Sequence, residues 1–136
     1  MNPGSRSYLV INIFIAGMVV VILAYSGIFS PEKNDYPVSC IHEKISGEPC
    51  PSCGLSHSFS YLVRGDVSSA AQWNIYGIRV FTFFVLQLLM RLIVSAVIFK
   101  TGRHPAWLLK ADILVSVPMF IICFRQFIGY YISLLS

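Results

Sequence analysis

Three long apolar runs divide the chain, and polar residues gather between them. The runs cover residues 8–29, 76–99 and 113–135. A helix needs about 20 predominantly apolar residues to cross a hydrocarbon layer about 30 Å thick. The pattern therefore predicts an all-α integral membrane protein with three transmembrane helices, in a single membrane domain that covers residues 1–136.

Two of these runs allow a second interpretation. The first follows Arg6 and could be a secretory signal peptide, but its apolar stretch is longer than the usual length of about 7–15 residues, which favours an uncleaved anchor. The third contains Pro118 and Arg125 and could end near Phe124, which would leave an interfacial tail. A proline is tolerated in a membrane helix where neighbouring groups satisfy the carbonyl that it frees.

The distribution of basic residues predicts the orientation. The short link after the second run is rich in them, with Lys100, Arg103 and Lys110, whereas the longer polar stretch 30–75 has only three. Short loops rich in Lys and Arg lie in the cytoplasm. We therefore expect the link and the N-terminus to be cytoplasmic and the loop 30–75 to lie outside the cytoplasm, with the C-terminus on the same outer side.

Composition narrows the function classes. The chain is 56% hydrophobic and 12% charged, which excludes a disordered protein, and its 136 residues are too few for a large soluble enzyme. The net charge of +4 follows from the asymmetry of the loops. It does not form the basic stripe that binds nucleic acid.

The loop 30–75 contains a tight cysteine turn followed by a helical pattern. The turn is Cys50-Pro51-Ser52-Cys53-Gly54, and the apolar residues of 55–63 then fall on one helical face. Gly65 ends this pattern, and Asp66 can cap a second short helix by accepting from the backbone of Ser68 or Ser69. We expect two short amphipathic helices at the membrane surface, the second of which ends at Asn74.

The ordered motif in this loop resembles a family of small bacterial inner-membrane proteins, domain of unknown function 2752. Its signature is an upstream Cys, a Gly, then CPxCG with an apolar residue and Thr/Ser-Arg, followed by Gly-Asp or Gly-Asn and a later Asn. The matching residues are Cys40, Gly47, Cys50, Pro51, Cys53, Gly54, Leu55, Gly65, Asp66 and Asn74. The resemblance covers roughly residues 40–99, looks like the Bacteroidota version, and implies a multi-pass protein of the bacterial inner membrane. With the orientation that the basic residues predict, the loop 30–75 is expected to be periplasmic. His57 stands where the family has Arg, and the family brings no established activity.

The loop cysteines support three kinds of chemistry. On the outer side, oxidising conditions favour a disulfide from Cys40 to Cys50 or Cys53. The same three cysteines with His57, or with His42 in its place, are a ligand set that suits zinc. A Cys50–Cys53 pair ahead of a helix could also exchange thiols and disulfides. Quinone-linked thiol oxidases generally need a second cysteine pair and four helices, so quinone is not expected as a cofactor.

Four polar residues inside the apolar runs are candidates for binding a partner. They are Arg79, Gln87, Arg91 and Arg125, and the three runs contain no Asp or Glu. Charges within the membrane usually find a partner. We therefore expect carboxylates of other membrane subunits, or lipid phosphate, to bind Arg91 and Arg125.

Together these features predict a small non-enzymatic membrane protein, an accessory or assembly subunit of a larger complex with a cysteine-stapled outer cap. The alternatives are a membrane thiol–disulfide oxidoreductase that uses Cys50 and Cys53, and a zinc-stabilised binding module. No serine triad or phosphate-binding glycine loop is present in the sequence.

Overall fold

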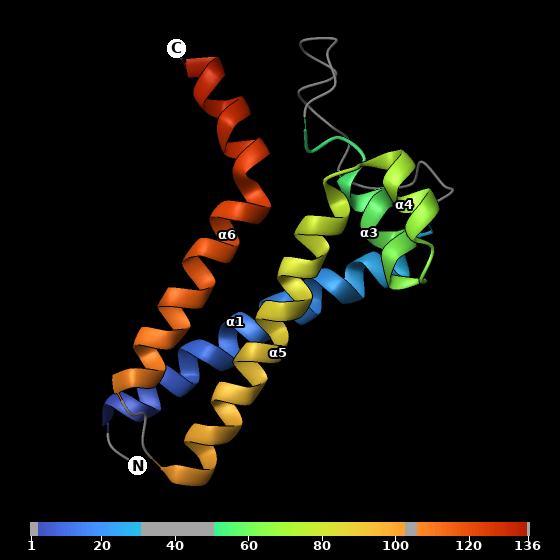
Figure 1. Ribbon diagram of the computed structural model, residues 1–136. Helices are drawn as coiled ribbons and strands as arrows, with labels where there is room; N and C mark the ends of the chain where they lie inside the picture. The colour runs from blue at the N-terminus through green and yellow to red at the C-terminus, as the bar shows by residue number, and fades with distance from the viewer. Residues whose placement is uncertain (1–2, 31–50, 103–105, 136) are drawn as a thin grey trace. The chain divides into compact units, whose positions relative to one another are not determined.

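The computed structural model describes residues 3–30, 51–102 and 106–135, and all regular secondary structure in these ranges is helical (Figure 1). The helices are α1 (Pro3–Ile28), α3 (Leu55–Val63), α4 (Val67–Trp73), α5 (Gly77–Thr101) and α6 (Ala106–Leu135). Of these, α1, α5 and α6 are long and apolar enough to cross a membrane. The structure therefore supports a multi-pass membrane protein with three spans.

The ends of two spans differ from the prediction. The first helix begins at Pro3 instead of residue 8, and the third begins at Ala106 instead of residue 113. Apolar runs mark the part of a helix that faces lipid, but the helix itself continues into its polar flanks. At about 1.5 Å per residue, the 30 residues of α6 extend for about 45 Å, which exceeds the hydrocarbon thickness. Pro118 lies inside α6 without ending it, and the helix continues past Phe124.

The chain forms two compact units. The first combines Met1–Ile22 with Phe83–Ile122, and the second combines Leu23–Thr82 with Cys123–Ser136. Each is described separately below.

In the first unit, the helices pack along narrow seams. The buried residues of α1 are Ser5, Leu9, Asn12, Ala16 and Val19, and those of α5 are Gln87, Arg91, Val94 and Ile98. Both sets recur at alternating intervals of three and four residues, which is the seam spacing of helices that pack along one another. Small residues on α1, such as Ser5 and Ala16, allow the close helix approach common in membranes.

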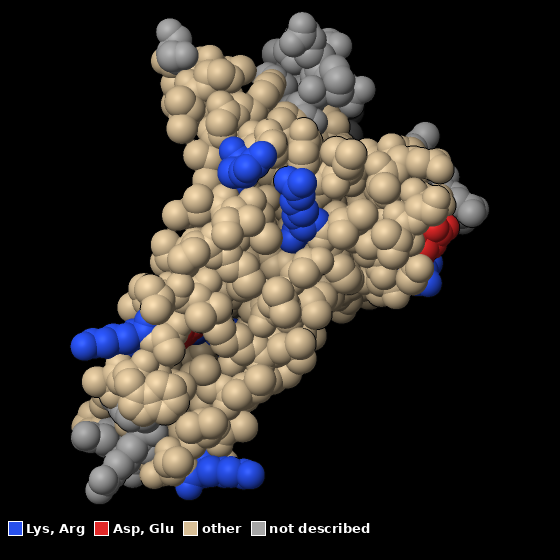
Figure 2. Space-filling view, viewed as in Figure 1, with Lys and Arg blue, Asp and Glu red and all other residues tan. Residues whose placement is uncertain are grey.

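An apolar cluster fills one part of this first unit. It consists of Leu9, Val94, Ile98 and Leu108. Outside the seams, the long helices expose many large apolar side chains, for example Leu114 at 75%. On the face shown in Figure 2, uncharged residues cover most of the surface. Such exposure fits a lipid solvent, because lipid tails are as apolar as the side chains that they contact.

In the second unit, α3 and α4 pack against each other (Figure 1). Gly65 joins them at a φ of 84°, in the left-handed region that favours glycine. Asp66 then caps α4, because its carboxylate accepts from the Ser69 backbone N–H at 3.0 Å and from the Ser69 hydroxyl at 2.6 Å. The turn glycine and the aspartate cap thus have the local roles that the sequence suggested.

Candidate functional site

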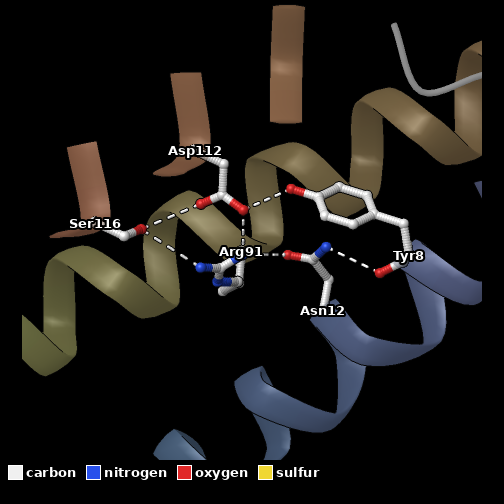
Figure 3. A network of polar contacts seen from close by, with 5 residues as sticks. All are labelled: Tyr8, Asn12, Arg91, Asp112 and Ser116. Carbon is white, nitrogen blue, oxygen red and sulfur yellow. Dashed lines mark hydrogen bonds and ion pairs between the residues drawn. The ribbon is translucent and has the colours of Figure 1, made fainter. Parts of the chain in front are cut away.

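A network of polar side chains joins the three long helices within the first unit (Figure 3). Its centre is Arg91 on α5, whose Nη1 donates to Asp112 Oδ2 on α6 at 2.6 Å and to Asn12 Oδ1 on α1 at 2.9 Å. Its Nη2 donates to the Ser116 hydroxyl on α6 at 3.4 Å. We call Tyr8, Asn12, Arg91, Asp112 and Ser116 the Arg91 network.

The carboxylate of Asp112 is held by the same network. The Tyr8 hydroxyl donates to its Oδ2 at 2.5 Å, and the Ser116 hydroxyl donates to its Oδ1 at 3.2 Å. The Asn12 amide also donates to the Tyr8 carbonyl at 2.9 Å, one turn back along α1. Both charges are thus bound to each other and to neutral groups from neighbouring helices.

Burial makes these contacts energetically important. Arg91 is 9% exposed and Asp112 is 7% exposed. Removing two charges from water costs several kcal/mol per ion, and their attraction offsets this only where further hydrogen bonds satisfy the remaining polar atoms. Most of these atoms have such partners here. The exception is Arg91 Nε, which is buried and has no partner among the described residues.

The expectation that Arg91 lacks an acidic partner within the chain is wrong. Asp112 is that partner, and the two side chains form an ion pair at 2.6 Å. The physical reason is the start of α6, which lies at Ala106, so Asp112 is already within the helix. Because the sequence reasoning began the third span at residue 113, it placed Asp112 in the link.

The other polar residues of the spans have different environments. Gln87 is buried one turn from Arg91, on the same face of α5. Arg79 and Arg125 are exposed, and neither forms an ion pair or hydrogen bond with any residue in the described ranges. Among the described residues, Arg91 therefore has an acidic partner, whereas Arg79 and Arg125 have none.

The second site lies in residues 51–76, which we call the α3–α4 head. The turn that carries Cys53 ends at Gly54, with a φ of 74°. A Cβ at Gly54 would lie 2.6 Å from the backbone oxygen of Trp73, so both the backbone conformation and the space require glycine. Gly77 has a similar constraint, because a Cβ there would lie 2.7 Å from the Cβ of Ser58.

Asn74 holds the cysteine turn against the start of α5. Its side-chain amide donates to the carbonyls of Pro51 and Cys53, both at 2.8 Å. Its Oδ1 accepts from the Tyr76 backbone N–H at 2.9 Å. Asn74 is 8% exposed, so it satisfies backbone groups that have little access to water.

Only part of the predicted cysteine site can be described. Cys40, His42 and Cys50 lie outside the described residues, so the disulfide and the zinc site stay predictions. Cys53 is half-buried and directly precedes Gly54, the residue before α3. His57 lies within α3, and its ring stacks on that of Trp73, with centroids 4.1 Å apart.

Sequence reasoning missed the role of Arg64. This residue follows α3, and its guanidinium donates to the carbonyls of Gly27 at 3.0 Å, Phe29 at 3.2 Å and Ser60 at 2.8 Å. The hydroxyl of Ser60 donates to the Phe29 carbonyl at 2.6 Å. The last carbonyls of a helix have no intrahelical donor and carry negative partial charge. Arg64, directly after α3, therefore caps the end of α1.

No signal within the neighbouring sequence identifies this cap. Arg64 stands beside Gly65 and Asp66, and those two residues act locally on α3 and α4. The Gly27 carbonyl, in contrast, is 37 positions away in the sequence. Only the fold brings the two together.

Comparison with known proteins relates part of the chain to a family. No curated protein and no solved structure matches the chain. A match to a family model covers the turn at Cys53, the helices α3 and α4 and the first part of α5. It includes Gly54, Asp66 and Asn74, whose contacts hold the head together. Over residues 40–88, the chain is similar to the family described as Protein of unknown function (DUF2752).

Proposed function

We propose that this protein is a non-enzymatic accessory or assembly subunit of a larger complex in a bacterial inner membrane. The Arg91 network is the observation that carries the proposal. Polar side chains that act on a substrate within a membrane face a cavity or a water-filled path. The polar side chains of this network instead bind one another, so that α1, α5 and α6 form a fixed scaffold.

The orientation is part of this proposal. The N-terminus and the link before α6 lie in the cytoplasm, and the α3–α4 head lies in the periplasm. A position of the head at the membrane surface is supported by its exposed apolar side chains, which are those of Val67, Trp73 and Ile75. Tryptophan is enriched at membrane–water interfaces, where its ring contacts both lipid and water.

An impermeant thiol reagent on intact spheroplasts tests the orientation. In a chain whose native cysteines are replaced by serine, the Gln72→Cys variant should react and the Lys100→Cys variant should not. Both side chains are exposed, so accessibility within the protein is matched. The reverse pattern of labelling would invert the orientation.

Extraction of the full chain in native lipid nanodiscs tests the assembly role. We expect a membrane protein to copurify in fixed stoichiometry with the wild type, and to be lost from an Asp112→Asn variant that weakens the scaffold. Lys110→Gln is the matched control, because Lys110 is exposed two residues away on α6. Recovery of the wild type as a monomer with no stoichiometric protein would contradict the proposal.

The cysteine turn supports a second candidate, a thiol–disulfide oxidoreductase that uses Cys50 and Cys53. The supporting observation is that Asn74 fixes the Cys53 carbonyl, so the turn is held in place directly before α3. An enzyme of this type should accumulate a mixed disulfide with its substrate in a Cys53→Ser variant. An unchanged phenotype of both the Cys50→Ser and Cys53→Ser variants would exclude it.

The same turn can instead hold a disulfide staple or zinc. A thiol count with and without reductant distinguishes the staple, and metal analysis of the purified chain tests zinc. A structural zinc site should retain about one equivalent of metal, because four protein ligands bind zinc tightly.

A further inference from the structure

Arg79 and Arg125 lie at nearly the same height on neighbouring helices of the second unit. The rings of Tyr76 and Phe127 contact each other, with centroids 6.2 Å apart, and this contact sets the register. From it, Arg79 is three residues further along the chain, in the first turn of α5, and Arg125 is two residues back along α6. Successive helices joined by a short link run antiparallel. The forward step from Tyr76 to Arg79 and the backward step from Phe127 to Arg125 therefore lead in the same direction, by about 4.5 Å and about 3 Å respectively.

Both arginines have guanidinium groups available for an anion. Both side chains are exposed. The only acid among the described residues of the second unit is Asp66, whose carboxylate is bound by Ser69. The described residues of the second unit therefore supply no counter-charge to the pair.

The register also places the pair close to the membrane–water interface. Arg79 is two residues into α5, and Tyr130 and Tyr131 follow Phe127 by one turn of α6. Tyrosine is enriched at the level of the lipid headgroups. Arg125, which lies inside the third apolar run, is thus within about one or two turns of the headgroups, where lipid phosphates lie.

We propose that Arg79 and Arg125 together bind the phosphate of an anionic phospholipid, in the leaflet on the side of the α3–α4 head. A guanidinium group forms two parallel hydrogen bonds with phosphate oxygens, which suits arginine for this ligand. Two such groups at one height on adjacent helices can bind the same headgroup. This inference does not depend on the proposed assembly role or on the orientation of the chain.

Native mass spectrometry of the full chain in a neutral detergent tests the site. The probes are phosphatidylglycerol, phosphatidylcholine with the same acyl chains, and inorganic phosphate. The test variant is Arg79→Gln/Arg125→Gln, and the matched control is Lys100→Gln/Lys110→Gln, which removes two exposed cations from the same two helices. Circular dichroism of each variant checks that the helices are retained.

We expect the wild type to bind one phosphatidylglycerol molecule more tightly than phosphatidylcholine. Each basic residue at a membrane surface strengthens the binding of an anionic lipid about fivefold. Loss of both arginines should therefore weaken phosphatidylglycerol binding about 25-fold and leave phosphatidylcholine binding unchanged. The lysine control should stay within about twofold of the wild type, since nonspecific attraction alone would affect both double variants equally.

Two results would overturn the inference. One is equal binding of phosphatidylglycerol by the arginine variant and the wild type, which would leave a carboxylate of another protein as the partner of the pair. The other is displacement of the lipid by millimolar inorganic phosphate, which would identify a site for the free ion. An Arg79→Lys/Arg125→Lys variant should bind with intermediate strength, because lysine keeps the charge but not the paired hydrogen bonds.

Discussion

The Arg91 network and the α3–α4 head use arginine in two different ways. In the network, Arg91 is buried and binds side chains, above all the carboxylate of Asp112. In the head, Arg64 is exposed and binds backbone carbonyls, including those of Gly27 and Phe29. A full charge within lipid-facing helices needs a full opposite charge, whereas at the end of a helix the partial charges of the carbonyls are sufficient.

The largest expected effect comes from breaking the ion pair. An Asp112→Leu variant leaves Arg91 buried without its counter-charge and should lower the free energy of unfolding by about 3–5 kcal/mol. Reversible unfolding in mixed detergent micelles measures this. The double variant Arg91→Leu/Asp112→Leu should recover most of the loss, because neither charge remains. If the double variant is as unstable as the sum of the single variants, the pair is not coupled as described.

A smaller effect is expected from Arg64→Ala. Hydrogen bonds to a charged group contribute about 1.5–3 kcal/mol, and the carbonyls at the end of α1 would lose their donor. Hydrogen exchange measured by mass spectrometry should show faster exchange in residues 23–29. In an Arg64→Lys variant, the exchange rate of these residues should lie between those of the wild type and Arg64→Ala, because lysine retains the charge but not the several donors of the guanidinium. Unchanged exchange in Arg64→Ala would show that water replaces the cap at no cost.

The next effect concerns the hydrogen bonds between the Asn74 side chain and the backbone of the head. An Asn74→Ala variant removes the hydrogen bonds to Pro51, Cys53 and Tyr76 and should cost about 1–2 kcal/mol, within the range for backbone groups left unpaired. It should also raise the rate at which Cys53 reacts with a thiol reagent. Gln72→Ala, at an exposed position of α4, is the control and should change neither quantity.

The smallest effect is the dependence of the α4 cap on pH. Hydrogen bonds from the Ser69 hydroxyl and backbone lower the pKa of Asp66 below its ordinary value. A lowered pKa in the folded state means that the cap stabilises α4 fully above the ordinary aspartate pKa of about 3.9. This stability is lost as the pH falls through the lowered value. Amide exchange of α4, measured at acid pH and corrected for the intrinsic rate, should show this loss in the wild type but not in Asp66→Ala.

The sequence was informative wherever the cause of structure is local. Apolar runs predicted three spans, and the order of Gly65 and Asp66 predicted the turn and the cap between α3 and α4. These features depend on neighbours within a few residues, so pattern and propensity describe them.

The sequence was least informative where distant residues meet. The interaction between Arg91 and Asp112 depended on the start of α6, and the contact of Arg64 with α1 depended on the fold. One sequence signal was available for the first of these. Pro105 directly precedes Ala106, and proline is common in the first turn of a helix. A helix that starts there includes Asp112, which lies four residues after the buried Leu108 and four before Ser116.

The separation of Arg91 and Asp112 along the chain has a consequence for biosynthesis. Asp112 is 21 residues downstream, so at about 5–20 residues per second the ribosome adds it about one to four seconds after Arg91. During that interval, α5 contains a cation whose acid has not yet been made, although Asn12 is already available. Joint entry of α5 and α6 into the bilayer as a hairpin would avoid the cost of a buried cation without its acid.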